Sequence, residues 1–339
     1  MKRKIIVALV MILAGLMSLY MREDTDFTRN GMAMNTIIRM TVYSHDDSAL
    51  DDAFALLTEI DRRLSMYDPS SDLSLINRNA GTAPVTPSHM TIEAVSEAMK
   101  LHEITGGVFN PLIGPVTRLW KINSAGGNIP SQESLDHAVK LADIRNIAVS
   151  SDKIFLREKG CIIDLGGMAK GYASTEISQL LKDKGVKSAI IDLGGNVHAV
   201  GAKPDGSSWR IGVRNPLQPF GTPALVAEVK DCAVITSGNY ERYKTIDGKK
   251  YSHFFNPITG ESVNSDLLSV TVISENGSMA DGLATAFMIT GVDKALEILR
   301  NMDNPPGVIF ITQEGIIATS NLRSTIKQSL IPVTFAEVR

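Results

Sequence analysis

Two polar side chains stand four residues apart in the segment SMADGLATAFMITG, whose apolar content and spacing are typical of a helix. Asp281 and Thr285 therefore share one helix face, one turn apart. A carboxylate and a hydroxyl placed in this way suit a hard cation that keeps some of its waters, which is how proteins usually hold Mg²⁺. The alternative is structural: an Asp near a helix N-terminus is favoured by the helix dipole, and the Thr packs beside it.

The segment CIIDLGGMAKGYA combines an apolar run, a carboxylate, two glycines and the start of a helix. Backbone N–H groups at such a helix start can face a phosphate, and Lys170 can add its charge. Asp164 is suited to reading a ribose or a base edge. Because the segment matches neither the P-loop nor the dinucleotide-binding fingerprint, a nucleotide site is only suggested, and a plain tight turn remains the competing interpretation.

His253 stands among aromatic and Asn side chains in YSHFFNPITG, shortly after the polar segment TSGNYERY. Imidazole is the side chain used most often as a general base, so His253 is a candidate for proton transfer. It is one histidine among six, and a surface or core role is the competing interpretation. The sequence contains neither a GxSxG elbow nor an HExxH motif, which argues against a serine hydrolase and a zinc peptidase.

Hydrophobic periodicity predicts the elements that must position these residues. We expect helices at 48–66, 91–105, 131–141, 169–184, 279–290 and 292–301. We expect strands at 32–43, 147–149, 154–156, 161–165, 188–193, 209–213, 224–229, 233–236, 269–273 and 308–311. The Pro- and Gly-containing stretch after Gly107 is predicted to be an ordered loop. The hexapeptide IIDLGG occurs twice, which is too few copies for a solenoid.

The composition is that of a globular protein, with 339 residues, 44% hydrophobic and 21% charged. No linker rich in Ser, Pro or charge interrupts the chain, so we expect one α+β domain of mixed sheets with packed helices from about residue 30 to 335. A net charge of −3 argues against a broad nucleic-acid surface. Cys161 and Cys232 lack metal or redox spacing, and a single bridge between them stays open.

The N-terminus has a different composition from the rest of the chain. Three basic residues, Lys2–Lys4, precede an uncharged apolar run, Ile5–Tyr20, which is the pattern of an export signal. The run is slightly short for a membrane span, since roughly 17 to 25 apolar residues are typical. We therefore interpret residues 1–20 as a signal peptide or a membrane anchor, and we expect an exported protein in the periplasm or on the outer face of the cytoplasmic membrane. A buried N-terminal helix is the less favoured alternative.

Eight short motifs, taken in order, resemble the ApbE family of FAD:protein FMN transferases. They are MAMNT (32–36), LSMYDPSSDLSLIN (64–77), TGGVFNPLIGPVTRLW (105–120), DLGGMAKGYA (164–173), DLGGN (192–196), TSGNYERY (236–243), HFFNPITG (253–260) and ADGLAT (280–285). The resemblance implies a single ApbE-like domain. It also implies Mg²⁺-dependent transfer of the FMN part of FAD to a Ser or Thr hydroxyl of a flavoprotein, with release of AMP.

The resemblance further implies roles for individual residues. His253 and Asp281 would be catalytic, with His253 transferring the proton. Mg²⁺ would lie between the carbonyl of Gly167 and the side chains of Asp281 and Thr285, with the carbonyl of Ala284 nearby. The flavin nucleotide would be held by Met34, Tyr67, Val108, Phe109, Asn110, Asp164, Lys170 and the backbone around Phe255. Subunits of Rnf- or Nqr-type electron-transport complexes are the family's usual acceptors.

The sequence departs from the family's pattern at three places. Asn35 replaces the glycine of the common MGT, Asn110 replaces the aspartate of the usual FDP, and Thr175 stands where the family often has Asp. Two other functions stay open. An FAD pyrophosphatase would use water in place of the protein hydroxyl and give FMN and AMP, and a non-catalytic protein would only bind the flavin.

Overall fold

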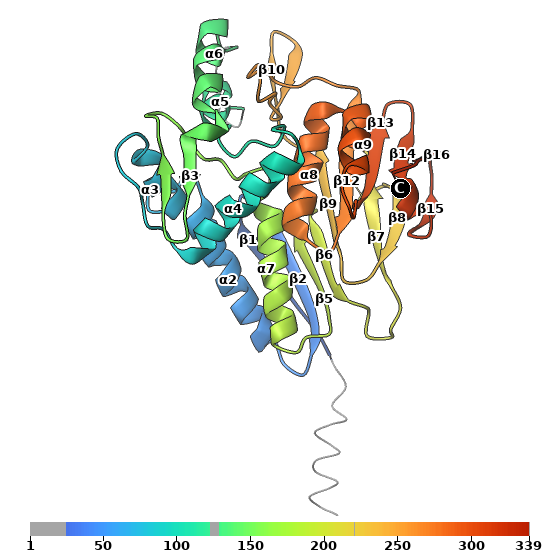
Figure 1. Ribbon diagram of the computed structural model, residues 1–339. Helices are drawn as coiled ribbons and strands as arrows, with labels where there is room; N and C mark the ends of the chain where they lie inside the picture. Colours follow the sequence, from blue (N-terminus) through green and yellow to red (C-terminus); the bar gives the residue numbers. More distant parts are fainter. Residues whose placement is uncertain (1–24, 123–128, 220, 339) are drawn as a thin grey trace, which may run out of the picture.

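The computed structural model describes residues 25–122, 129–219 and 221–338, and its largest element is a nine-stranded sheet (Figure 1). Neighbouring strands are antiparallel except for the last pair, which is parallel. In order across the sheet the strands are β1 (Thr25–Ala33), β2 (Thr36–Ser44), β5 (Ser188–Leu193), β6 (Val197–Gly201), β9 (Ala233–Gly238), β12 (Leu267–Ser274), β13 (Gly307–Thr312), β14 (Ile316–Thr319) and β16 (Val333–Ala336).

Three smaller sheets accompany the large one. Strands β7 (Trp209–Arg214), β8 (Pro223–Val229) and β15 (Ile326–Ser329) form a three-stranded sheet in the order β15-β8-β7. Its buried side chains pack against one face of β9, β12, β13 and β14 in a second hydrophobic cluster. The other two are hairpins, β3 (Ile147–Val149) with β4 (Ile154–Leu156) and β10 (Tyr243–Ile246) with β11 (Lys249–Ser252).

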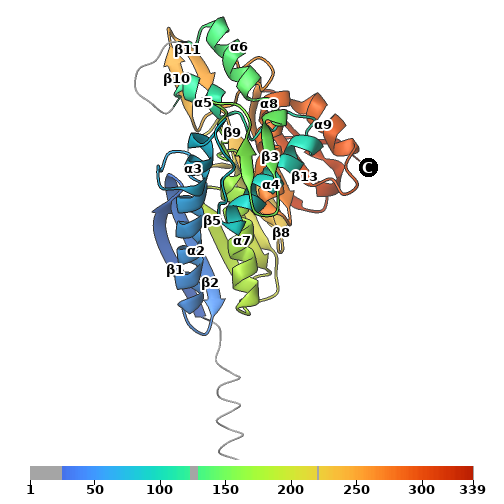
Figure 2. The same ribbon diagram turned by 60° about the vertical axis from the view of Figure 1, so that its left-hand side comes forward.

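Helices cover the opposite face of the large sheet. Figures 1 and 2 show α2, α7 and α8 lying side by side along it, with α4 crossing over them. The helices are α2 (Ser48–Leu64), α3 (Asp72–Arg78), α4 (His89–Ile104), α5 (Gly114–Trp120), α6 (Gln132–Leu141), α7 (Ala169–Asp183), α8 (Gly277–Thr290) and α9 (Val292–Arg300), with 3₁₀ turns at Ile144–Asn146 and Ser320–Leu322. The main hydrophobic core lies between the sheet and helices α2, α3, α4, α7, α8 and α9, whereas α5 and α6 pack in a small separate cluster.

The α+β class with mixed sheets and packed helices is thus confirmed. All six predicted helices are present with ends displaced by at most a few residues, and the strands at 147–149, 154–156 and 188–193 have the predicted bounds. The expected loop after Gly107 is partly wrong, because α5 lies within it. The limits of a single domain at 30 and 335 stay a prediction.

The first predicted strand is in fact a hairpin. Met34 and Asn35 form its two-residue turn, with φ angles of 50° and 59° as a type I′ turn requires. The Met34 N–H donates to Asp61 Oδ2 at 2.9 Å. Asn adopts this backbone region readily, whereas Met rarely does. The apolar alternation continued through the turn, so the pattern alone predicted one strand.

The segment Cys161–Leu165 was predicted to be a strand, and this is wrong. The segment is buried, but it joins no described sheet. The side chain of Asn77 satisfies Ile163 instead, accepting its N–H at 2.7 Å and donating to its carbonyl at 3.0 Å. The N–H of Asp164 donates to the carbonyl of Pro111 at 2.8 Å. The apolar run predicted burial correctly, yet burial does not specify which groups complete the backbone hydrogen bonds.

Both cysteines are free thiols, and burial raises the pKa of each. The Cys161 thiol contacts the carbonyl oxygen of Leu141 at 3.2 Å. The predicted signal peptide or anchor at residues 1–20 lies outside the described residues. Within the part that is described, no helix has the length and apolar content needed to span a bilayer.

Candidate active site

Helices α7 and α8 approach each other closely because glycines stand where they touch. A Cβ atom on Gly171 would lie 2.1 Å from the carbonyl oxygen of Gly277 and 2.6 Å from Cβ of Asp281. Any larger side chain at this position would push the helices apart. The contact therefore brings the first turn of α7, which follows the first DLGG motif, against the first turns of α8.

Two side chains fix the start of α8. Asn276 is its N-cap, and its Oδ1 accepts the N–H of Met279 at 2.8 Å. Thr175 on α7 accepts the N–H of Gly277 at 2.9 Å through its hydroxyl oxygen. Thr175, one of the departures from the family's pattern, thus satisfies an amide that the helix itself leaves unpaired.

Asp281 is held in the contact between these helices with only 4% of its surface exposed. Its Oδ2 accepts the N–H of Gly171 at 2.9 Å, and its Oδ1 accepts Nδ2 of Asn196 at 3.3 Å. Burial raises the pKa of the Asp281 carboxyl, while the charge of Lys170 and these two hydrogen bonds act in the opposite direction. A buried carboxylate of this kind is stabilised further by a cation.

Thr285 lies one turn further along α8, and its hydroxyl donates to the carbonyl of Gly167 at 2.9 Å. Two ligands at right angles on Mg²⁺, each about 2.1 Å from the ion, would be separated by about 3 Å. A carbonyl, a hydroxyl and a carboxylate are hard oxygen donors, so Gly167, Thr285 and Asp281 fit this cation. Ala284, the fourth predicted ligand, is the buried residue before Thr285.

Clusters of three or more His, Cys, Asp or Glu side chains that could hold a metal do not occur within 25–122, 129–219 and 221–338. The predicted donor set contains a single carboxylate, that of Asp281. Such a set suits Mg²⁺, which usually takes one or two carboxylates and keeps several waters.

The bend between Asp164 and α7 is closed by the N–H of Gly166, which donates to Asp164 Oδ1 at 2.9 Å. Loss of solvent raises the pKa of the Asp164 carboxyl, and the Gly166 amide, the Thr117 hydroxyl and two arginines oppose that rise. Burial raises the pKa of Asp281 and Glu241 and lowers that of His253, and the positive charge of Lys170, in the first turn of α7, acts to lower all three. Its ammonium group is therefore the cationic centre that these three side chains share.

His253 is partly buried, and its ring packs on Phe254 with centroids 4.1 Å apart. Burial lowers the pKa of His253 to about 4, and the charges of Arg242 and Lys170 contribute, although the Arg242 carbonyl acts against them. Nδ1 lies 3.0 Å from that carbonyl oxygen. Since a carbonyl can only accept, Nδ1 carries the hydrogen and Nε2 of the neutral ring is free to act as a base.

Tyr67 is 72% exposed, which is unusual for a large aromatic side chain. Loss of solvent around its hydroxyl raises its pKa, and the charge of Asp164 adds to the rise. Tyr67 and Asp164 are thus close enough to interact. The open ring offers a flat surface for a flavin or an adenine.

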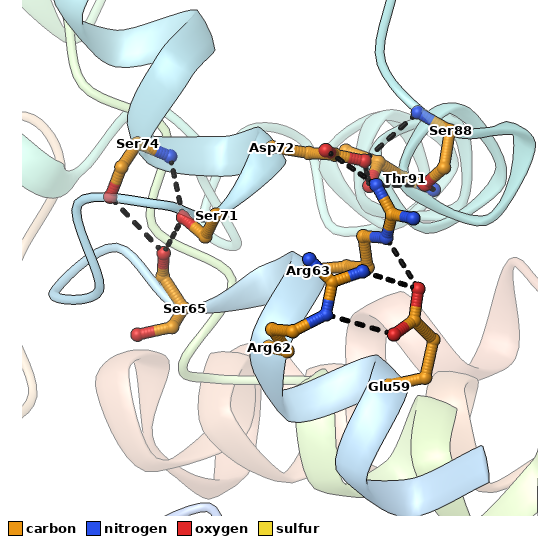
Figure 3. Close-up of polar contacts among 9 residues, drawn as sticks. All are labelled: Glu59, Arg62, Arg63, Ser65, Ser71, Asp72, Ser74, Ser88 and Thr91. Atoms are coloured by element: carbon orange, nitrogen blue, oxygen red, sulfur yellow. Dashed lines mark hydrogen bonds and ion pairs between the residues drawn. The ribbon is translucent and has the colours of Figure 1, made fainter.

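A polar network holds the loop that carries Tyr67, as Figure 3 shows. At its centre, the carboxylate of Asp72 accepts from the N–H of Ser88 and the hydroxyl of Thr91, both at 2.9 Å, and from Arg63 at 3.0 Å. Arg63 in turn pairs with Glu59 at 2.6 Å. The network ties the end of α2 to the starts of α3 and α4.

The predicted flavin-binding stretch from Val108 to Asn110 has structural contacts of its own. Phe109 is buried, and its ring would be 3.3 Å from a Cβ placed on Gly167. Asn110 donates through Nδ2 to the carbonyl of Ala142 at 2.8 Å. An Asp, as in the usual family pattern, could not make that bond. Val108 is partly buried against the main core.

Phe255 and Met34 complete the predicted set. Phe255 is buried in a small cluster and stacks on Trp120 with ring centroids 5.9 Å apart. Met34 lies at the tip of the β1–β2 hairpin. Thr36, which follows this turn, packs against the turn between β5 and β6. A Cβ on Gly194 in that turn would lie 2.0 Å from the Thr36 hydroxyl oxygen.

Comparison with known proteins then decides the family. The sequence profile of the ApbE family matches residues 34–310. The chain belongs to the ApbE family. A relative from Treponema pallidum (strain Nichols), named FAD:protein FMN transferase, is 31% identical over 94% of each chain. A protein of the same name from Klebsiella pneumoniae (strain 342) is 31% identical over 89% of this chain and 95% of its own.

Solved structures of ApbE proteins share the fold. The ApbE protein of Thermotoga maritima superposes with a TM-score of 0.82 and 26% identity, covering 90% of this chain and all of its own. The flavinyl transferase ApbE of Pseudomonas stutzeri in its apo form gives a TM-score of 0.81 and 27% identity, covering 91% and 99%. The predicted ApbE-like architecture is confirmed.

Three residues at the ApbE-family site were not predicted from the sequence. Asn196 was quoted only as part of DLGGN, Asn77 only as the end of a motif, and Glu241 only within TSGNYERY. The available signal for Asn196 was its place directly after the second copy of IIDLGG. Its partner Asp281 is distant in the sequence, so no local pattern could connect the two residues.

Proposed function

We propose that this chain transfers the FMN part of FAD to a Ser or Thr hydroxyl of an acceptor protein in a Mg²⁺-dependent reaction that releases AMP. The proposal is supported by membership in the ApbE family and by the names of its relatives. The structural observation that carries it is the pair of contacts between α8 and the start of α7, Thr285 with the Gly167 carbonyl and Asp281 with the Gly171 N–H, with the charge of Lys170 acting on Asp281.

The reaction requires charge to be neutralised at a pyrophosphate. The acceptor oxygen bonds to the phosphorus on the riboflavin side, the bond from that phosphorus to the bridging oxygen breaks, and AMP leaves with the electron pair. Bound Mg²⁺, held by Gly167, Asp281 and Thr285 with the Ala284 carbonyl nearby, would shield the phosphates. Lys170 contributes a second positive charge on the same side.

The remaining residues bind and orient the reactants. Nε2 of His253 accepts the proton of the attacking hydroxyl, a role worth roughly 100- to 10,000-fold in rate. Tyr67 and Asp164 position the ring system and its polar edge. Met34, the stretch 108–110 and the backbone at Phe255 complete the walls of the nucleotide site.

Incubation with FAD, Mg²⁺ and candidate acceptor fragments tests this function. Intact-mass measurement should show an acceptor that has gained one FMN, together with equimolar AMP, and chelation of Mg²⁺ should stop both. Release of AMP and FMN without a labelled acceptor would show a pyrophosphatase instead. Intact FAD after long incubation would show a protein that only binds the flavin.

We also propose that the enzyme acts outside the cytoplasm on a membrane or exported flavoprotein such as a subunit of an Rnf- or Nqr-type complex. The support is the basic and apolar N-terminal pattern at residues 1–20. Fractionation followed by sequencing of the mature N-terminus tests it. A protein confined to the cytoplasm with an intact first residue would contradict it.

A further inference from the structure

Residues at or directly after the ends of both copies of IIDLGG contact helix α8. The first copy leads to Gly167, whose carbonyl accepts from Thr285. The second, at 190–195, is followed directly by Asn196, whose amide lies against Asp281. The repeat thus supplies one contact to each of the two α8 side chains that are expected to bind the cation.

In both bends the Asp side chain accepts a glycine N–H, although the glycine is two residues on in the first copy and three residues on in the second. In the first copy, Asp164 Oδ1 accepts the N–H of Gly166 at 2.9 Å, and in the second, Asp192 Oδ1 accepts the N–H of Gly195 at 2.7 Å. The second bend is also fixed from outside, because Gly194 lies against Thr36 at the hairpin tip. Asn196 therefore projects from a turn that is held on two sides.

Asn196 itself is almost completely buried, with 1% of its surface exposed. Its Nδ2 donates to Oδ1 of Asp281 while the N–H of Gly171 donates to Oδ2. Each carboxylate oxygen thus has one neutral donor from a different element, which fixes the plane of the group. Each oxygen also keeps a lone pair for a cation.

We propose that Asn196 is a positioning residue of the cation site, which holds the Asp281 carboxylate in a fixed orientation for Mg²⁺. The inference rests on the proposed Mg²⁺-dependent function. A neutral amide is suited to this task, because it stabilises the carboxylate without adding a second negative charge inside the protein. Side chains that hydrogen-bond a metal ligand orient it and thereby affect metal affinity.

Titration with Mn²⁺ alone tests the inference without an acceptor or turnover. The paramagnetic signal of free Mn²⁺ gives the dissociation constant for wild type, Asn196→Leu and Asn196→Ala, and circular dichroism monitors folding. Loss of the donor should weaken Mn²⁺ binding about 10- to 100-fold. Asn196→Ser keeps a donor in nearly the volume of Ala and should recover part of that loss.

Thr319→Val serves as the matched control. Thr319 is fully buried in β14 of the large sheet, and its hydroxyl oxygen accepts the N–H of Val308 at 2.9 Å. Replacing it by Val therefore also removes a buried hydrogen bond. It should lower thermal stability and leave Mn²⁺ affinity unchanged. A purely structural role for Asn196 would give this same result for Asn196→Ala.

The outcomes are distinct. Wild-type Mn²⁺ affinity in folded Asn196→Leu or Asn196→Ala overturns the inference while leaving the cation site in place. If Leu is too large to fold, the Ala and Ser pair decides, since the two differ by one hydroxyl. A wild-type protein that binds no Mn²⁺ overturns the proposed cation site and this inference together.

Discussion

At the scale of single residues, the environment of His253 sets the pH at which it can act. Burial, Arg242 and Lys170 hold its pKa at about 4, and its Nδ1 hydrogen is committed to the Arg242 carbonyl. A base must be unprotonated, and protonation of this ring becomes substantial only as the pH falls through about 4. The histidine is therefore ready to accept a proton throughout the neutral range.

Single-turnover AMP release should accordingly be insensitive to His253 titration from about pH 5.5 to 8, and should decline only in stronger acid. The measurement is the rate constant of one turnover at saturating FAD, Mg²⁺ and acceptor across this range. His253→Gln should remove the acid limb that belongs to the histidine. A decline centred near pH 6.5 would contradict the shifted pKa.

Asn110 is the residue that best reports a departure from the family's pattern. Asn110→Asp would place a carboxylate oxygen opposite the Ala142 carbonyl, to which the amide now donates. We expect a loss of about 1 to 3 kcal/mol in the free energy of unfolding, since a buried acceptor loses its donor. Urea denaturation measures it, and a variant as stable as wild type would show that the bond contributes nothing.

The residue scale also shows what the sequence could predict of the site. Asp281 and Thr285 could be paired because their four-residue spacing puts them on one helix face. In the structure Thr285 contacts the Gly167 carbonyl and Asp281 contacts the Gly171 N–H. The role of Asn196 could not be predicted, because its contact with Asp281 depends on how a turn that is distant in the sequence folds against α8. The metal and flavin roles of these residues stay predictions.

At the scale of elements, the α7–α8 contact depends on the missing side chain of Gly171. Gly171→Ala would place a Cβ 2.1 Å from a carbonyl oxygen, so the helices must separate. We expect a destabilisation of about 1 to 3 kcal/mol and weaker Mn²⁺ binding, measured by denaturation and titration. Gly212→Ala is the control, because its nearest neighbour would be 3.5 Å away. Equal behaviour of the two variants would argue against a tight contact.

The hydrogen bonds and ion pair around Asp72 hold three helix ends together: the end of α2 and the starts of α3 and α4. Burial raises the pKa of Asp72, but hydrogen bonds from Ser88 and Thr91 and the Arg63 pair outweigh it, so the pKa is lowered overall. A lowered carboxyl pKa adds stability that is present above the ordinary carboxyl pKa and is lost as the pH falls through the lowered value.

Asp72→Ala should therefore cost about 2 to 3 kcal/mol at neutral pH, since it removes an acceptor used by three donors. The difference from wild type should shrink in acid, as denaturation at several pH values would show. Asp68→Ala in the neighbouring loop is the control, because Asp68 is bonded only locally to Ser70. A pH-independent difference would mean that the charge of Asp72 is not involved.

Local pattern predicted these elements well where one face is buried, and failed where the tertiary context decides. The helix at Ser48–Leu64 follows from its apolar spacing, with buried residues on one face. The Cys161–Leu165 run is just as apolar, yet its backbone pairs with Asn77 and a loop. The hairpin turn at Met34 was missed because Met is not a usual turn former and no glycine follows Asn35.

At the scale of the whole molecule, the α+β class could be predicted from the mixture of helical and strand patterns. The strand order could not, since β9 lies between β6 and β12 and β16 joins parallel to β14 through pairings that no local signal specifies. Such pairings are chosen by the burial of both sheet faces, and they decide where the DLGG turns meet α8.

FAD and Mg²⁺ should stabilise the whole folded structure, because a ligand that binds only the folded state shifts the unfolding equilibrium toward it. FAD with Mg²⁺ at about 100 times the dissociation constant should add about 2.7 kcal/mol to the free energy of unfolding. Chelation by EDTA should remove most of that gain, while EDTA without FAD should change little. Chemical denaturation measures each condition, and a gain from FAD that survives EDTA would separate flavin binding from the metal.

The hydrogen bond between Thr285 and Gly167 joins residues 118 positions apart, and Asp281 meets Asn196 across 85. A ribosome must therefore have delivered nearly the entire polypeptide before any of these partners can meet. A chain that is threaded across a membrane in extended form would carry neither nucleotide nor ion with it, and would have to find both in the compartment where it folds.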